Sequence, residues 1–106
     1  EQYSKAIEIA PRDADIYSNL AAAHVQKYQL SGAQDQLESA LEEYTEAVEL
    51  EPNLPEAHFG LGVVHILLQR TDEAILAFTR FQELDTGKDP LATKNAVEYL
   101  KQLRGQ

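Results

Sequence analysis

Three histidines are the side chains in this sequence best suited to chemistry, because imidazole binds metal ions and transfers protons near neutral pH. They are His24, His58 and His65. A zinc site needs three or four ligands that converge on one point, and the sequence has neither a cysteine nor an HExxH motif. We therefore predict no metal site and no cofactor.

Catalysis by an activated nucleophile is not indicated either. The sequence lacks a GxSxG motif and a glycine-rich phosphate-binding loop. Serine, histidine and aspartate all occur, but no spacing pairs a nucleophile with a base. The prediction is that the chain is not an enzyme and has no catalytic residues.

A row of glutamates is the second candidate site. Glu38, Glu42, Glu46 and Glu49 recur at steps of four, four and three, which places them on one ridge of a helix. Like charges at this spacing destabilise a helix, so the presence of four of them calls for an explanation. It is either a solvated face that keeps the chain soluble or a surface that attracts a basic partner. The mildly basic tail of a neighbouring copy is one such partner.

The charge distribution bears on which partners are excluded. The chain of 106 residues has a formal charge of -9, and no basic residue occurs between Lys27 and Arg70. This acidic protein is therefore not expected to bind nucleic acid, which requires clustered lysine and arginine. The longest apolar stretch, from Phe59 to Leu68, is about half as long as a membrane-spanning helix, so no span is predicted.

The chain begins at Glu1 inside an amphipathic pattern, so we interpret it as a piece of a longer protein. The sequence shows no signal peptide. The compartment is not determined by these features. A soluble protein is expected, with the cytoplasm slightly favoured.

A short sequence motif recurs along the chain. Residues 3–11 and 44–52 share an aromatic residue, an alanine, an apolar-Glu-apolar run and a final proline, 41 residues apart, and a degenerate third copy occupies residues 78–85. Apolar residues recur at steps of three and four through these segments, which predicts helices and no strands. Six helices are expected, at residues 1–10, 14–30, 34–51, 55–68, 71–85 and 90–103. We expect Asp13 to cap the second of them, and Asp89-Pro90 to open the last.

These motifs resemble the tetratricopeptide repeat pattern. Its slots are filled in the first complete copy by Tyr17, Leu20, Ala21, His24, Ala40, Tyr44, Ala47 and Pro52. In the next copy they are filled by His58, Leu61, Gly62, His65, Ala74, Phe78, Phe81 and Thr86. The resemblance implies an all-α solenoid of antiparallel helix hairpins with a right-handed superhelix, in which the histidines are packing residues.

The expected domain organisation is a single repeat domain over residues 1–106. Residues 1–13 end a preceding repeat, 14–54 form a lengthened repeat, 55–88 form a repeat of ordinary length and 89–106 form a capping helix. The surplus in the lengthened repeat lies around Gly32, with about one turn added to each helix. Tyr28, Leu30, Ala33 and Leu37 near this tip either pack on one another or form a docking knob.

The resemblance implies that the chain is a protein–protein interaction module or scaffold whose ligand lies on the concave side of the first helices. The implied peptide-binding residues are Asn19, Ala22, Val25, Gln26, Phe59, Val63 and Ile66. For the helix at 55–68 the alternative is that the tail helix and its other neighbours cover it on all sides. The cationic clamp by which some relatives grip a terminal carboxylate is missing, so an apolar or basic peptide is the expected ligand.

A self-assembling structural module is the alternative function. The truncated first repeat has an apolar side, formed by Tyr3, Ile7 and Ile9, that lacks its own partner helix. Copies that stack end to end would cover it.

Overall fold

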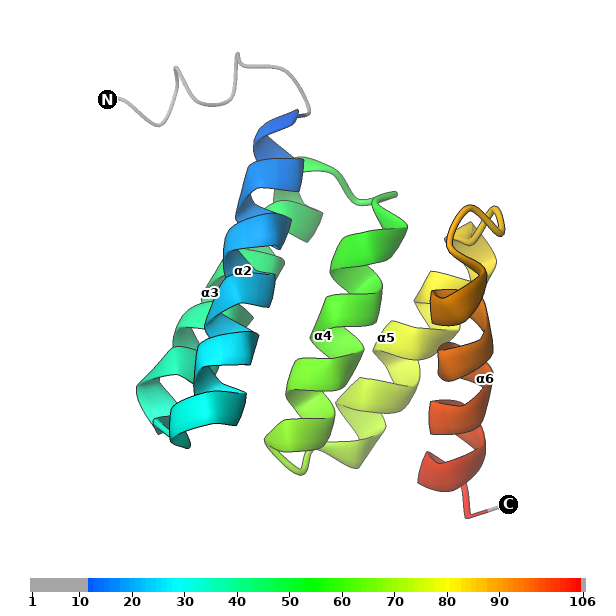
Figure 1. The fold of residues 1–106 in the computed structure, drawn as a ribbon. Coiled ribbons are helices and arrows are strands. Elements are labelled where there is room, and N and C mark those ends of the chain that lie inside the picture. The colour runs from blue at the N-terminus through cyan, green and yellow to red at the C-terminus, as the bar shows by residue number, and fades with distance from the viewer. Residues whose placement is uncertain (1–11, 106) are drawn as a thin grey trace. The chain divides into compact units, whose positions relative to one another are not determined.

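The computed structural model describes residues 12–105 and shows five helices. These are α2 (Arg12–Ser31), α3 (Gln34–Leu50), α4 (Pro55–Leu67), α5 (Thr71–Leu84) and α6 (Pro90–Leu103) (Figure 1). No strand occurs among the described residues, so the all-α prediction is confirmed. The predicted helix at residues 1–10, with Tyr3, Ile7 and Ile9, lies outside them, which accounts for five helices rather than six.

The helix boundaries follow local signals in most places. The Asp89 side chain accepts a hydrogen bond from the Ala92 backbone nitrogen at 3.3 Å, and Pro90 lies in the first turn of α6, as expected. At α2 the predicted cap is wrong, because the helix begins at Arg12 and Asp13 lies inside its first turn. A carboxylate in that turn interacts favourably with the positive end of the helix dipole, so Asp13 suits either position.

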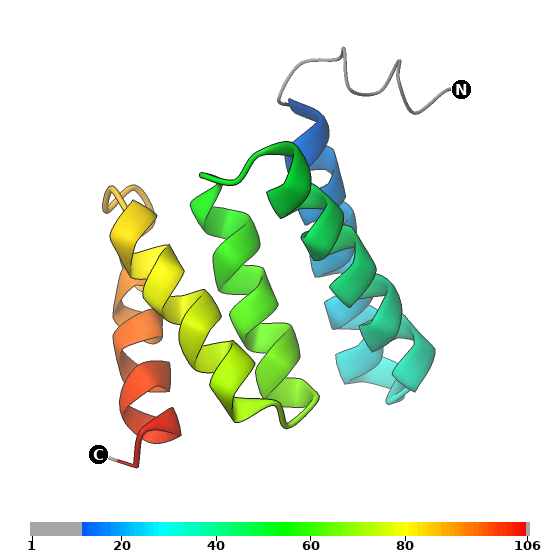
Figure 2. The same ribbon diagram turned by 180° about the vertical axis from the view of Figure 1, so that it is seen from behind.

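The helices form two compact units, one ending at Leu54 and the other starting at Pro55. In the first, α2 and α3 run antiparallel and are joined by a turn at Gly32 (Figures 1 and 2). The Gly32 backbone has φ +73°, and its N–H donates to the Tyr28 carbonyl at 2.6 Å. Only glycine adopts this left-handed conformation without strain, which explains why α2 ends here.

The α2–α3 hairpin is longer than the α4–α5 hairpin. Helices α2 and α3 have 20 and 17 residues, whereas α4 and α5 have 13 and 14. The difference is about one turn for α3 and about two for α2, at about 3.6 residues per turn. The larger surplus in α2 arises partly because α2 starts earlier than its sequence predicts.

Small side chains allow the helices of the first unit to pack closely. Ala14 and Ala21 of α2 and Ala40 and Ala47 of α3 are fully buried, and so is Leu37 of α3. Close packing of this kind leaves little room for volume changes.

In the second unit α6 packs against the α4–α5 hairpin. Its Ala96 and Leu100 join Ala74, Phe78 and Phe81 of α5 in one buried cluster. Tyr99 and Leu103 pack against this cluster, whereas Lys94, Glu98, Lys101 and Arg104 are exposed. The tail helix therefore has a buried apolar inner side, and its outer side carries these charged residues.

Candidate partner-binding surface

The predicted binding residues of α2 lie mainly on its exposed side. Asn19, Ala22 and Gln26 are exposed, at steps of three and four residues, and therefore form one row along the helix. Val25 differs, because only 9 % of its surface is exposed. Three of the four predicted residues are thus available to a partner, and Val25 supports the interior.

Two exposed apolar residues beside this row were missed by sequence reasoning. Ile16 and Leu20 are 57 % and 46 % exposed and lie one turn apart on α2. Leu20 was assigned to a packing slot of the repeat, and Ile16 was not assigned. The signal was that α2 has apolar residues around most of its circumference, so one buried stripe could not account for all of them.

The predicted binding residues of α4 have a different environment. Phe59, Val63 and Ile66 are half-buried and pack against the α5–α6 cluster. The Phe59 ring lies edge-on to Phe78 and Phe81, with centroid distances of 5.4 and 5.3 Å. Its centroid is 6.3 Å from that of Tyr99 of α6. These side chains therefore contribute to the interior of the second unit and also keep some exposed surface.

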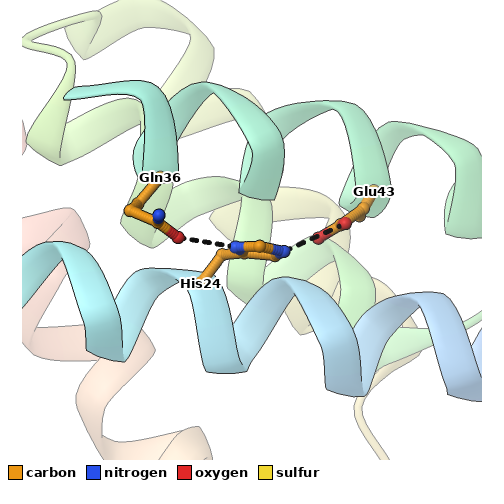
Figure 3. A network of polar contacts seen from close by, with 3 residues as sticks. All are labelled: His24, Gln36 and Glu43. Atoms are coloured by element: carbon orange, nitrogen blue, oxygen red, sulfur yellow. Dashed lines mark hydrogen bonds and ion pairs between the residues drawn. The ribbon is translucent and has the colours of Figure 1, made fainter. Parts of the chain in front are cut away.

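His24 joins the two helices of the first unit through polar contacts. Figure 3 shows its ring between Gln36 and Glu43 of α3. His24 Nδ1 is 2.8 Å from Gln36 Oε1, and Nε2 is 3.3 Å from Glu43 Oε2. The family resemblance implied a packing residue at this slot, and the imidazole in it connects α2 to α3 through two polar contacts.

Glu43 is an unusual partner for this histidine. Burial raises the pKa of Glu43, His24 opposes the rise, and the neighbouring Glu42 adds to it. Glu43 Oε1 is also buried without a hydrogen-bond partner among the described residues. Within residues 12–105 no group of three or more histidine, aspartate or glutamate side chains is placed to hold a metal ion.

His65 is half-buried, and its surroundings favour the neutral ring. Burial lowers its pKa, Glu73 partly restores it, and Arg70 adds to the lowering. In the described part of the chain its Nδ1 atom is buried without a hydrogen-bond partner. A ring in this environment contributes mainly packing.

The acidic ridge of α3 is only partly as predicted. Glu38, Glu42 and Glu49 are exposed, but Glu46 is half-buried beside them. Asp35 is exposed and extends the row by one step of three residues. Every charged residue of α3 is a carboxylate, so the face has a single sign.

At the tip of the first hairpin, Leu37 is fully buried and Leu30 is 89 % exposed. Tyr28 and Ala33 are half-buried. The residues considered for a docking knob therefore do not form one patch.

The repeat pattern matches known families. A family model described as TPR repeat matches residues 1–27 and 33–69, more than half of the chain. The chain belongs to the tetratricopeptide repeat family. A second model, described as tetratricopeptide repeat, matches residues 55–87. The gap in the first match, residues 28–32, covers the last turn of α2 and Gly32.

Tetratricopeptide repeats are generally protein–protein interaction modules and scaffolds rather than enzymes. No match to the chain was found among curated proteins. None of the helices within residues 12–105 has the length and apolar character needed to cross a membrane.

Proposed function

We propose that this tetratricopeptide repeat chain binds an extended segment of another protein along the exposed side of α2, with Asn19, Ala22 and Gln26 as the contact row. The observation that carries the proposal is the exposure of these three side chains in one row of a first repeat helix. The family uses these slots for ligands.

The spacing of the two amides suits an extended peptide backbone. Asn19 and Gln26 are seven residues apart, which corresponds to about 10.5 Å along the helix axis. An extended chain rises about 3.3 Å per residue, so three ligand residues span the same distance. Each amide side chain can both donate to a backbone carbonyl and accept from a backbone N–H.

The neighbouring side chains favour a ligand with apolar residues. Ala22 lies between the two amides and leaves room for a ligand side chain. Ile16 and Leu20, on the adjacent side of the helix, supply apolar surface that a ligand would remove from water. Asp15 is exposed one turn before Asn19, so a basic residue near one end of the peptide is favoured.

In the second unit, Phe59, Val63 and Ile66 of α4 are proposed as a separate binding surface through the parts of their side chains that remain exposed. Their packing against the α5–α6 cluster limits what they can offer. A substitution such as Val63→Glu would place a carboxylate against an apolar cluster and disturb folding. Binding is therefore better tested on α2.

The test is an NMR titration of the 106-residue chain with three pools of extended peptides: basic, apolar and acidic. Amide shifts centred on Asn19, Ala22 and Gln26, caused by the apolar or basic pool, are the expected result. A response to none of the pools, or shifts that leave α2 unaffected, would overturn the proposal.

A further inference from the structure

Helix α6 has an outer side that is both apolar and basic. Besides its buried Ala96 and Leu100, it has two exposed apolar residues, Leu91 and Val97, which are 65 % and 41 % exposed. Three cations are exposed on the same side, Lys94, Lys101 and Arg104, against one carboxylate, Glu98. We refer to Leu91, Lys94, Val97, Glu98, Lys101 and Arg104 as the α6 outer face.

The exposed row of α3 has the complementary charge. It consists of Asp35, Glu38, Glu42, Thr45 and Glu49, at steps of three, four, three and four residues. Such a sequence of steps keeps the row on one side of the helix. All its members are acidic except Thr45.

We propose that the α6 outer face of one copy of this chain docks antiparallel on the exposed α3 row of a second copy. The proposal concerns α3 and α6, and it does not rest on the peptide-binding function proposed for α2. Because every copy has both faces, the contact joins two different surfaces of the same chain.

The spacing of the charges selects the antiparallel arrangement. Lys94 and Lys101 are seven residues apart, as are Glu42 and Glu49, so both pairs span about 10.5 Å. Antiparallel alignment places Lys94 opposite Glu49 and Lys101 opposite Glu42. Arg104 then falls within one residue of the position opposite Glu38.

The same register avoids a contact between like charges. Glu98, the only carboxylate on the α6 outer face, falls opposite Thr45, the only uncharged member of the α3 row. In a parallel alignment, the two lysines can also be paired with two carboxylates that are seven residues apart. Arg104 then lies opposite Thr45 or Pro52 and has no carboxylate partner. Three complementary pairs without a repulsive one therefore occur in the antiparallel register, and charge complementarity of this kind specifies partner and orientation.

The contact should be weak and sensitive to salt. Ion pairs between exposed side chains contribute little each, so a dissociation constant on the order of 0.1–1 mM is expected. At about 0.1 M ionic strength the general repulsion between acidic chains is screened beyond about 10 Å, while pairs in contact still attract. At about 1 M the screening length falls to about 3 Å and the pairs weaken as well.

The test is sedimentation equilibrium of the 106-residue chain over a range of concentrations, in both salt conditions. Two charge-reversed variants are compared with it: Lys94→Glu with Lys101→Glu, and Glu42→Lys with Glu49→Lys. All four residues are exposed, so far-UV circular dichroism should show unchanged helix content. A matched control, Lys27→Glu with Lys88→Glu, changes the net charge as much as the first variant but lies outside the α6 outer face.

The expected result is a mass that rises with concentration at about 0.1 M salt and much less at about 1 M. Each charge-reversed variant should associate at least tenfold more weakly, as an order-of-magnitude estimate, and an equimolar mixture of the two should associate again. The control should associate like the unchanged chain. A mass independent of concentration, association of the Glu42→Lys, Glu49→Lys variant at the original strength, or a mixture that stays monomeric would each overturn the proposal.

Discussion

The ring of Phe78 occupies the space that a side chain at Gly62 would need. A Cβ atom added to Gly62 would lie 2.6 Å from Cε2 and Cζ of Phe78. Phe78 is fully buried, and its ring stacks on Tyr99 at a centroid distance of 5.0 Å. The close approach of α4 to α5 therefore depends on this glycine. Because the Phe78 ring also stacks on Tyr99 of α6, a shift of that ring would change how α6 packs.

Gly62→Ala should destabilise the protein although alanine is the better helix former. Displacing a packed ring costs about 1–3 kcal/mol. The gain in helix propensity offsets about 1 kcal/mol. We expect a net loss of about 1 kcal/mol in the free energy of unfolding, measured by urea denaturation.

The variant Phe78→Leu, whose side chain is smaller and has no ring, provides the control for this effect. In that background Gly62→Ala should be neutral or stabilising, because the clash is gone and the helix propensity remains. An equal loss in both backgrounds would show that the alanine acts through something other than Phe78.

Leu30 and Leu37 form a matched pair at the tip of the first hairpin. Leu37 is fully buried, so Leu37→Ala should lower the free energy of unfolding by about 2–5 kcal/mol. Leu30 is 89 % exposed, so Leu30→Ala should change it by no more than about 0.5 kcal/mol. Thermal unfolding of the two variants checks the difference, and a large loss for Leu30→Ala would mean that the tip is packed.

His65 should make the protein less stable as the solution is acidified. Burial lowers the pKa of His65 from its ordinary value of 6.5, so below that pH the folded state binds fewer protons than the unfolded state. The stability it contributes is present above pH 6.5 and is lost as the pH falls towards the lowered pKa. In His65→Phe this part of the pH dependence should disappear, as urea midpoints at about pH 7 and about pH 5 would show. If the urea midpoints of the two proteins change equally with pH, His65 is not the source of this pH dependence.

Glu43 should have the opposite effect. Its pKa is raised by burial from the ordinary 4.5, so the stability that it contributes is present below that pH and is lost as the pH rises through the raised pKa. Glu43→Gln keeps an oxygen for His24 Nε2 and removes the half-buried charge. The variant should be the more stable protein near neutral pH, with the difference closing on acidification. A difference that does not vary with pH would count against a buried charge at this position.

The sequence predicts the local features of this fold better than the burial of single side chains. Asp89-Pro90 marks the start of α6 because a cap and a first-turn proline act within one turn of the chain. Asp13 misled the prediction for α2, because an aspartate is favourable both as a cap and within the first turn.

Burial depends on contacts between residues far apart in sequence, which periodicity does not reveal. Phe59 lies 40 residues before Tyr99, and only the packing of α6 places the two rings side by side. Conversely, Leu20 occupies a slot of the repeat pattern and is still 46 % exposed. The candidate binding row on α2 could therefore be named from the resemblance, while the different environments of the α2 and α4 residues required the structure.

The most direct test of the proposed function compares Ala22 of α2 with an exposed residue of α3. Ala22 lies in the contact row with Asn19 and Gln26, whereas Thr45 is exposed on α3, outside that row. The measurement is the affinity of the responding peptide for Ala22→Glu and for Thr45→Glu, by isothermal titration calorimetry. We predict that Ala22→Glu weakens binding about tenfold or more, by placing an unpaired carboxylate under the ligand, and that Thr45→Glu weakens it less than about threefold. Equal effects of the two substitutions, or no effect of Ala22→Glu, would contradict the placement of the ligand on this row.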